Sequence, residues 1–436
     1  MRVLMTSFAL NAHFYGSVPL AWALRAAGHE VRFASQPALT ASITGAGLTA
    51  VPVGRNHTAD DVMADVGAEI FSRYRYLDFS GGDPAMLEPE FLQGINTVLT
   101  STFYMGANDD EMVDDLVAFA RDWQPDLIIW EPFTFAGAVA ARVTGAAHAR
   151  LLWGPDLFLQ MRQAFHGAMQ SRPAELRDDS LAEWLTWTLG RYGHAFDEEM
   201  IVGQATIDQM PASIRPELST RSVPMQYVPY NGPAVVPAWL REPPQRPRVC
   251  LTLGISVRDI AFIGDVVSLD ELFEAVGDLD IEVVATLDEA QRAMVRHVPA
   301  NTHVVEYVPF HALMPTCSAV VHHGGAGTWS TAAAHGVPQL MLAWMWDNVY
   351  RAKRTEELGA GLYLPPEKLS AASLRDGLVR LLSEPSFNAN AELLRAEIQA
   401  GPTPASVVST LEELAAAHQS CRPALVEVGP AAQRAL

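Results

Sequence analysis

The chain has 436 residues, of which 49% are hydrophobic and 18% charged, so it can bury two sizeable cores and is not a disordered polymer. Lys and Arg total 30 against 50 Asp and Glu, and the formal charge of −20 argues against nucleic acid as a partner. No apolar run approaches the roughly 20 residues that a membrane-spanning helix needs. The start, Met1 to Met5, predicts a β-strand rather than a signal peptide, and the three cysteines lack metal-ligand spacing. We therefore expect a cytoplasmic protein.

The N-terminal half of the chain alternates short apolar strands with helices. Strands are expected at Val3–Met5, Glu30–Ser35, Asp126–Trp130 and His148–Trp153, and helices at Ser17–Ala27 and Phe133–Val143. Asn108 precedes three acidic residues, a pattern typical of a helix N-cap followed by an acidic first turn. We assign these elements to an N-terminal domain, residues 1–226.

A proline-dense segment, residues 227–247, cannot continue a helix or a central strand and is predicted to link two domains. A second series of strands is expected at Val249–Leu253, Ile281–Thr286, Val304–Tyr307, Ala319–His322 and Gln339–Leu342. We expect residues 248–400 to form a C-terminal domain, residues 401–419 a helix that packs back on the N-terminal domain, and residues 420–436 a loose tail. The predicted fold class is α/β, with two Rossmann-like, doubly wound domains facing each other across a cleft.

A glycine-rich turn, His322-His323-Gly324-Gly325-Ala326-Gly327-Thr328, lies between an apolar strand and a helical run that begins near Trp329. A helix N-terminus here would expose free N–H groups at the positive end of the helix dipole, and glycines would let a diphosphate approach the backbone. His322 and Thr328 can each add a side-chain donor. The pattern indicates a phosphate site, with a turn that serves packing alone as the alternative.

His13 lies in the loop after the first strand, and ligands of open α/β sheets bind beyond the carboxyl ends of the strands. An imidazole there can accept a proton near neutral pH, although many lone histidines are structural. Asp278 and Asp280 have the spacing of a metal-binding D-x-D motif. They precede their strand, so we interpret them as a surface turn and expect no metal.

The segments HHGGAGT (322–328), HGVPQ (335–339) and WDN (346–348) together resemble the donor-binding signature of bacterial GT-B glycosyltransferases that decorate antibiotics. The segments VPLAWALRAAGHEVR (18–32) and WQPDLIIWEP (123–132) extend the resemblance to the macrolide branch of that family. The resemblance implies inverting, metal-independent transfer of a deoxysugar, in particular an amino-deoxysugar, from TDP to a hydroxyl of a macrolide or other polyketide. It implies no cofactor besides this co-substrate.

The resemblance also implies roles for individual residues. Those expected at the diphosphate are His322, Gly325, Ala326, Gly327 and Thr328, with Gly254 and Ser256 facing the same cleft; Val308 and Phe310 are expected at the base, and Trp346, Asp347 and Asn348 at the donor sugar. Asp347 could instead cap a helix. His13 matches the base that deprotonates the acceptor. Glu131, a glutamate where many relatives carry aspartate, either holds the His13 imidazole or pairs with a substrate ammonium group.

Two other functions share this architecture, a non-catalytic GT-B helper subunit and a nucleotide-sugar epimerase. A Rossmann dehydrogenase is poorly supported, because the turn from Thr6 to Gly16 has no G-x-G-x-x-G motif. Large aromatic residues such as Phe71, Phe103 and Phe158 fit an apolar acceptor pocket, although such residues are more often ordinary core. Members of the macrolide branch often work with a cytochrome-P450-like helper protein, which the resemblance raises as a hypothesis here.

Overall fold

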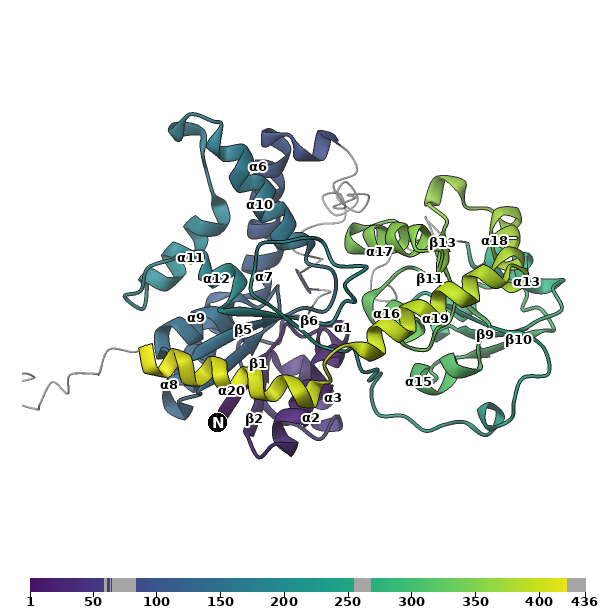
Figure 1. The fold of residues 1–436 in the computed structure, drawn as a ribbon, viewed down its shortest axis with the longest axis horizontal. Coiled ribbons are helices and arrows are strands. Elements are labelled where there is room, and N and C mark those ends of the chain that lie inside the picture. The colour runs from purple at the N-terminus through teal and green to yellow at the C-terminus, as the bar shows by residue number, and fades with distance from the viewer. Residues whose placement is uncertain (59–60, 63, 65–83, 255–267, 422–436) are drawn as a thin grey trace, which may run out of the picture.

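Two parallel β-sheets, one in each half of the chain, organise the computed structural model, which describes residues 1–58, 61–62, 64, 84–254 and 268–421 (Figure 1). The N-terminal sheet has the order β3-β2-β1-β4-β5-β6-β7, and every neighbouring pair is parallel. Its strands are β1 (Arg2–Thr6), β2 (Glu30–Ser35), β3 (Thr49–Pro52), β4 (Leu127–Trp130), β5 (Ala147–Leu151), β6 (Ala205–Asp208) and β7 (Ser222–Pro224). The order reverses direction between β1 and β4, where ligands of such sheets bind.

Helices cover both faces of this sheet. They are α1 (Asn11–Phe14), α2 (Val18–Ala26), α3 (Thr40–Gly45), α6 (Pro89–Val98), α7 (Met105–Ala107), α8 (Asp110–Trp123), α9 (Phe135–Thr144), α10 (Leu157–Gln170), α11 (Ser180–Gly190) and α12 (Glu199–Val202). Alternate residues of β1 point to opposite faces. Leu4 packs with Leu116 of α8, whereas Val3 and Met5 pack with Leu20 of α2 on the other side. Burial on both faces explains why the strands are continuously apolar.

The C-terminal sheet repeats this plan with the order β10-β9-β8-β11-β12-β13, again parallel throughout. Its strands are β8 (Arg248–Thr252), β9 (Glu282–Thr286), β10 (Thr302–Val305), β11 (Ala319–His322), β12 (Gln339–Met341) and β13 (Gly361–Tyr363). The helices of this half are α13 (Leu269–Gly277), α14 (Glu289–Met294), α15 (Phe310–Leu313), α16 (Ala326–Ala334), α17 (Trp346–Glu357), α18 (Ala371–Ser383) and α19 (Pro385–Ala400). The two sheets give the predicted pair of Rossmann-like domains.

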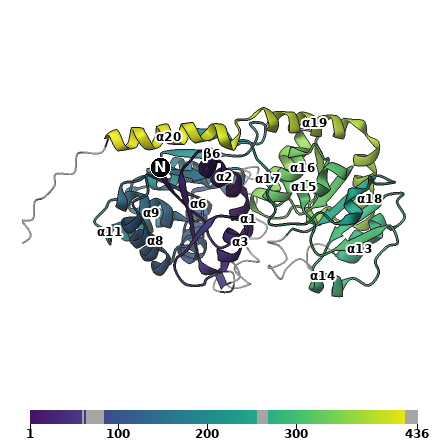
Figure 2. The ribbon, with the colours of Figure 1, turned by 90° about the horizontal axis from the view of Figure 1, so that it is seen from below.

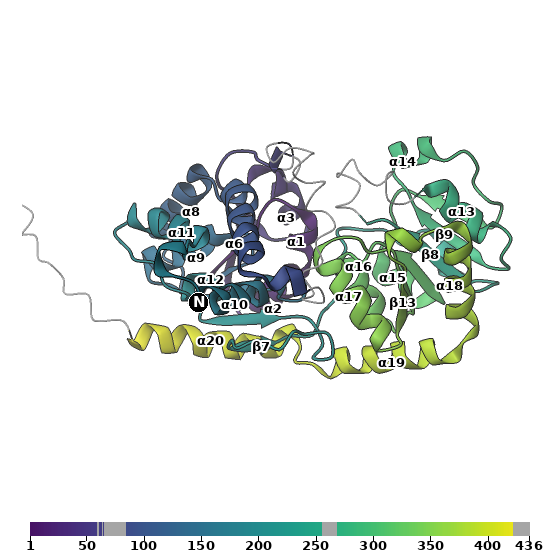
Figure 3. The same cartoon turned by 90° about the horizontal axis from the view of Figure 1, so that it is seen from above.

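The last helix, α20 (Pro404–Cys421), returns to the N-terminal domain. Figures 2 and 3 show α19 and α20 along one side of the molecule, with α19 on the C-terminal domain and α20 beside α2. Val407, Leu411 and Leu414 of α20 are buried in the N-terminal core. Within the described part of the chain, no helix has both the length and the apolar composition to span a membrane.

The helix cap expected at Asn108 was wrong by one residue. Asp109 caps α8, because its side chain accepts from the Met112 N–H at 2.9 Å. The Asn108 side chain is buried instead; it donates to the carbonyl of Phe133 and accepts from the N–H of Ala136 at 2.8 Å. Asn108 thereby joins the start of α8 to the start of α9.

We predict that α20 contributes to the stability of the N-terminal domain. Leu411 is fully buried, so Leu411→Ala should lower the free energy of unfolding by about 2–5 kcal/mol, measured by chemical denaturation. Leu393→Ala on α19 is the matched control, because that side chain is 69% exposed and should change stability little. Equal effects of the two substitutions would contradict the assignment of α20 to this core.

Candidate active site

A cavity of about 260 Å³ lies between the two domains, where the carboxyl ends of both sheets meet. The N-terminal domain contributes His13, Gly16, Phe133, Trp153 and Gln209; the C-terminal domain contributes Gly254, Thr286, Val308, Phe310, His323, Gly325 to Thr328, Trp346 to Asn348 and Arg351. Figure 3 shows α1 facing α16 and α17 across this boundary. Residues from the linker, Tyr227, Tyr230 and Asn231, complete the wall.

His13, on the short helix α1, is held tightly at the N-terminal wall. Its Nδ1 lies 3.3 Å from Oε2 of Glu131. The imidazole also stacks with the rings of Phe133 and Trp153, at centroid distances of 5.4 and 4.7 Å. Since Nδ1 faces the carboxylate, Nε2 is the ring nitrogen that can accept a proton from a ligand in the cavity.

Glu131 follows β4 and is buried, with 4% of its surface exposed. Its carboxylate accepts from the N–H groups of Phe8 (3.2 Å) and Phe133 (2.9 Å), from Nε1 of Trp153 (3.1 Å) and from the hydroxyl of Thr134. Burial alone would raise the pKa of Glu131, but His13 and these donors outweigh it and lower the pKa below its ordinary value. Glu131 does not line the large cavity, which favours the role of holding His13 over pairing with a substrate ammonium group.

The N-terminus of α16 opens into the cavity, and the helix begins at Ala326, earlier than the expected start near Trp329. Gly325 is the N-cap and has no side chain to offer, and the first intrahelical bond runs from Trp329 N–H to the Gly325 carbonyl at 2.9 Å. The N–H groups of Ala326, Gly327 and Thr328 therefore have no acceptor within the helix, and all three residues line the cavity. This is the arrangement that binds phosphate at helix N-termini.

His322 does not reach the cavity, contrary to expectation. Its side chain is fully buried in the C-terminal sheet, where Nε2 donates to Oε1 of Gln339 (2.8 Å) and Nδ1 accepts from the Gly324 N–H (3.0 Å). Burial lowers the pKa of His322 to about 4, so the ring is neutral. His323 lines the cavity in its place, and its Nδ1 is buried with no hydrogen-bond partner among the described residues.

Two glycines make room for the His323 ring. A Cβ on Gly254 would lie 2.3 Å from Cε1 of His323, and a Cβ on Gly325 would lie 2.5 Å from its Nε2. Gly254 also has a φ of +77°, which favours glycine. Burial lowers the pKa of His323 to about 3, so the imidazole is a neutral donor at the cavity wall. These two glycines therefore make room for the His323 ring. From the sequence, we expect the glycines only to let a diphosphate approach the backbone.

The start of α17 is organised by an arginine that the sequence analysis missed. Arg351 is 1% exposed, forms an ion pair with Asp347, and donates to Oδ1 of Asn348 (2.7 Å) and to the Gly324 carbonyl (3.1 and 2.9 Å). The spacing Asp347 to Arg351 is the i, i+4 pattern of a helical ion pair, which could have revealed it. Asp347 does not cap α17, because Met345 is the N-cap.

This ion pair also touches the opposite domain. Gly154 follows β5 in the N-terminal domain, and a Cβ there would lie 2.8 Å from Oδ2 of Asp347 and 2.9 Å from Nη1 of Arg351. Trp346 and Asn348 line the same part of the cavity. At this point, the side chains of Asp347 and Arg351 therefore lie directly against the backbone of Gly154.

The remaining predicted site residues are placed as follows. Val308 lines the cavity from the loop between β10 and α15, and Phe310 lines it from the first position of α15. The strand expected to end at Tyr307 ends two residues earlier, at Val305. Ser256 and Phe71 lie outside the described residues. Phe103 and Phe158 both pack against Phe133 beside His13, at centroid distances of 6.4 and 5.2 Å.

Two acidic groups outside the cavity have the spacing of possible metal ligands, and an arginine lies at each of them. Asp280 precedes β9, at the end of the strand far from the cavity, and its side chain is 91% exposed beside Arg246. His166, Asp179 and Glu198 place ligand atoms within 4.8 Å of one another. Arg162 already occupies that group, donating to Asp179 (2.7 Å) and Glu198 (2.6 Å).

Comparison with known proteins gives matches over nearly the whole chain. Models of the erythromycin biosynthesis protein CIII-like family match residues 22–254 (N-terminal domain) and 270–414 (C-terminal domain). The chain is 59% identical over 433 residues to aklavinone 7-beta-L-rhodosaminyltransferase of Streptomyces galilaeus, covering 97% of this chain and 98% of that protein. It is 54% identical over 419 residues to 10-deoxymethynolide desosaminyltransferase of Streptomyces venezuelae, covering 96% and 98%. The crystal structure of glycosyltransferase VinC with dTDP is 41% identical, with a TM-score of 0.85 over 96% of this chain and 100% of that one.

We predict that the Glu131 carboxylate stabilises the fold in a pH-dependent way. Because its pKa is lower in the folded chain, its contribution is complete above the unfolded pKa of about 4.3 and is lost as the pH falls through the folded value. The difference in unfolding free energy between wild type and Glu131→Gln should therefore shrink as the pH falls below about 4.3. Glu217→Gln, at an exposed site, should show no such difference, and equal pH profiles for both variants would contradict the prediction.

Proposed function

Because the chain belongs to the erythromycin biosynthesis protein CIII-like family of glycosyltransferases, we propose that it moves a deoxysugar from TDP to a hydroxyl of a hydrophobic polyketide in antibiotic biosynthesis. One observation carries the proposal: His13 on one domain and the open N-terminus of α16 on the other line a single cavity. A base for the acceptor and a binding site for the leaving diphosphate thus face the same space.

For the donor, we propose that the diphosphate binds the free N–H groups of Ala326, Gly327 and Thr328, with His323 rather than His322 as the imidazole donor. The unpartnered Nδ1 of His323 supports this choice, since a buried polar atom without a partner is costly. Val308 and Phe310 would contact the base, and Trp346 to Asn348 the sugar. The similarity to VinC, whose crystal structure is a complex with dTDP, supports TDP as the nucleotide.

The proposed reaction is a direct displacement that inverts the anomeric carbon. Nε2 of His13 takes the proton of the acceptor hydroxyl while the hydroxyl oxygen bonds to the anomeric carbon. The bond from that carbon to the TDP oxygen breaks at the same time. Glu131 stabilises the imidazolium that forms, by the logic of a catalytic triad. The helix terminus and His323 stabilise the charge on the departing diphosphate, so the mechanism requires no metal.

The aromatic wall beside His13 supports a bulky apolar acceptor. Phe133, Trp153, Phe103 and Phe158 pack together at this side of the cavity. An epimerase, which acts on the donor alone, would have no use for this wall, and a non-catalytic subunit would not need the His13–Glu131 pair. The names of the rhodosaminyl- and desosaminyltransferase relatives support an amino-deoxysugar as the transferred group.

We predict that wild-type protein binds TDP in the presence of EDTA, measured by calorimetry. His323→Ala should weaken binding by about 1–3 kcal/mol, the usual effect of removing one well-placed hydrogen-bond donor. His13→Ala should bind TDP like wild type but transfer no sugar to the acceptor. Loss of TDP binding on chelation, or unchanged affinity in His323→Ala, would contradict this donor site.

His322→Ala is the matched control for the neighbouring ring. It removes no side chain that lines the cavity, but it removes the partner of Gln339 inside the sheet and the acceptor of the Gly324 N–H. We expect a lower melting temperature and, at temperatures where the variant is folded, wild-type affinity for TDP. An unchanged melting temperature with weaker TDP binding would instead indicate that His322 contacts the phosphate.

We propose that the enzyme acts in the cytoplasm, as the composition of the sequence indicates. On the family resemblance alone, we retain a cytochrome-P450-like helper protein as a hypothesis. Co-expression tests the helper: the hypothesis predicts that transfer is low for the purified chain and rises when the helper is present. Full activity of the purified chain alone would remove it.

A further inference from the structure

The interdomain linker forms one wall of the cavity. Tyr227, Tyr230 and Asn231 all line it, although they belong to neither sheet. The hydroxyl of Tyr227 donates to the carbonyl of Gly327 (3.4 Å) and lies 3.3 Å from the hydroxyl of Thr331, both on α16. The start of the linker is thus fixed to the helix whose N-terminus opens into the cavity.

Asn231 bonds twice to the segment that carries Val308 and Phe310. Its carbonyl accepts from the hydroxyl of Tyr307 (2.7 Å), and its side-chain Oδ1 accepts from the N–H of His311 (3.2 Å). His311 is the second residue of α15, and the N-cap of that helix is Pro309, whose side chain makes no capping bond. Asn231 therefore supplies from the linker the acceptor that an N-cap side chain usually supplies.

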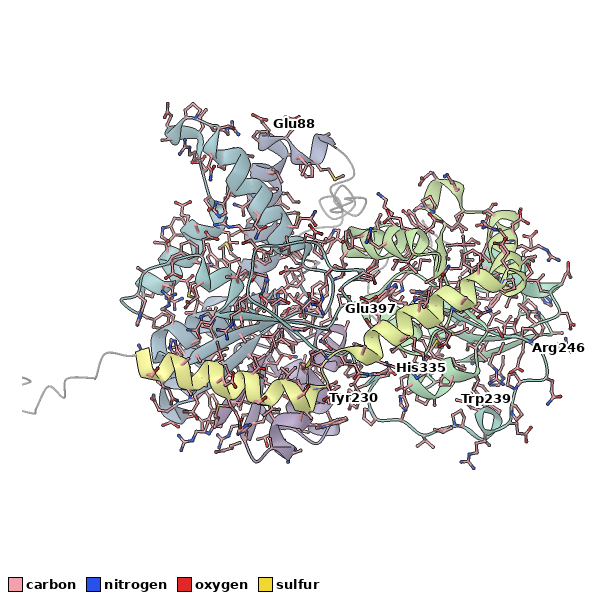
Figure 4. The ribbon with its side chains drawn as sticks, in the orientation of Figure 1. Glu88, Tyr230, Trp239, Arg246, His335 and Glu397 are labelled. Carbon is pink, nitrogen blue, oxygen red and sulfur yellow. The ribbon has the colours of Figure 1, made fainter. Side chains whose placement is uncertain are left out.

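The other side of this linker segment is fixed to the N-terminal domain. The Tyr230 ring packs edge-on against Tyr15 (5.4 Å between centroids) and Trp22 (5.1 Å). Gly232 has a φ of +94°, and a Cβ there would lie 3.0 Å from the Tyr15 hydroxyl. Figure 4 labels Tyr230 at the boundary between the two domains. With Tyr230 and Gly232 held on both sides of it, Asn231 has little freedom to move.

We propose that Asn231 is a positioning residue of the nucleotide site. Asn231 holds the segment that carries Val308 and Phe310 at the distance that the donor base requires. The inference rests on the proposed function, since it concerns the same donor site. It adds a role for a linker residue: the loop that contacts the base is fixed by a side chain from outside its own domain. Loss of this contact affects donor binding and leaves the His13–Glu131 pair unchanged.

The experiment is a calorimetric titration of TDP into wild type and Asn231→Ala, followed by steady-state kinetics with the TDP-sugar. We expect Kd and the donor KM to rise about fivefold, the effect of losing one capping acceptor, with kcat at saturating donor within about twofold of wild type. Asn231→Asp keeps an acceptor oxygen at the same place and should recover most of the affinity. Val235→Ala, in the same linker but 84% exposed, is the control and should bind TDP like wild type.

Several results would overturn the inference. These are wild-type affinity in Asn231→Ala, a fall in kcat with unchanged KM, or an Asn231→Asp variant as weak as Asn231→Ala. If Asn231→Ala does not fold, Tyr307→Phe removes the second bond and should raise Kd without lowering kcat; unchanged Kd would then overturn it. Failure of wild type to bind TDP would instead count against the proposed function itself.

Discussion

The N-terminal half of the site depends on one buried carboxylate. Glu131 bonds to Phe8 after β1, to Phe133 and Thr134 after β4, and to Trp153 after β5, while also pairing with His13. Three loops at the carboxyl edge of the sheet therefore converge on a single charge. Leaving such a charge without a partner would cost about 3–5 kcal/mol, so the loops and the imidazole stabilise one another. The glutamate side chain reaches the imidazole directly, since its Oε2 lies 3.3 Å from Nδ1 of His13.

The donor site proposed in the C-terminal half has to bind an anion, although the chain has a net charge of −20. The arginine at the cavity wall, Arg351, is already neutralised by Asp347, and burial keeps His323 neutral by lowering its pKa. In the proposed donor site, the groups available to attract a diphosphate are the oriented N–H groups at the start of α16, which act over a short range and in one direction. The overall charge acts at long range and is screened by salt, so it does not oppose binding within an enclosed site.

The sequence predicted the elements that carry strong local patterns. The strand from Glu30 to Ser35 and the strand from Ala319 to His322 have the predicted bounds, and His13 and Glu131 meet as the resemblance implied. The expectation that His322 faces the cavity was wrong for a geometric reason. Successive side chains at a strand end point to opposite sides, so an error of one residue exchanges a buried ring for a cavity ring. The local i, i+4 spacing could have revealed the Asp347–Arg351 pair, but not the bond from Arg351 to the Gly324 carbonyl, which lies 27 residues away in sequence.

The relative placement of the domains is set by contacts outside both sheets. The last residue of the N-terminal domain and the crossing to α20 meet where Gln226 N–H donates to the Pro402 carbonyl at 2.7 Å. Ser213 of the N-terminal domain bonds to Glu397 on α19 (2.9 and 2.6 Å) and to Arg354 on α17 (2.8 Å). The proposed base and the proposed diphosphate site belong to different domains, and displacement of reacting groups by about 1 Å can cost a hundredfold in rate. These contacts therefore belong to the catalytic geometry as much as the residues that touch the ligand do.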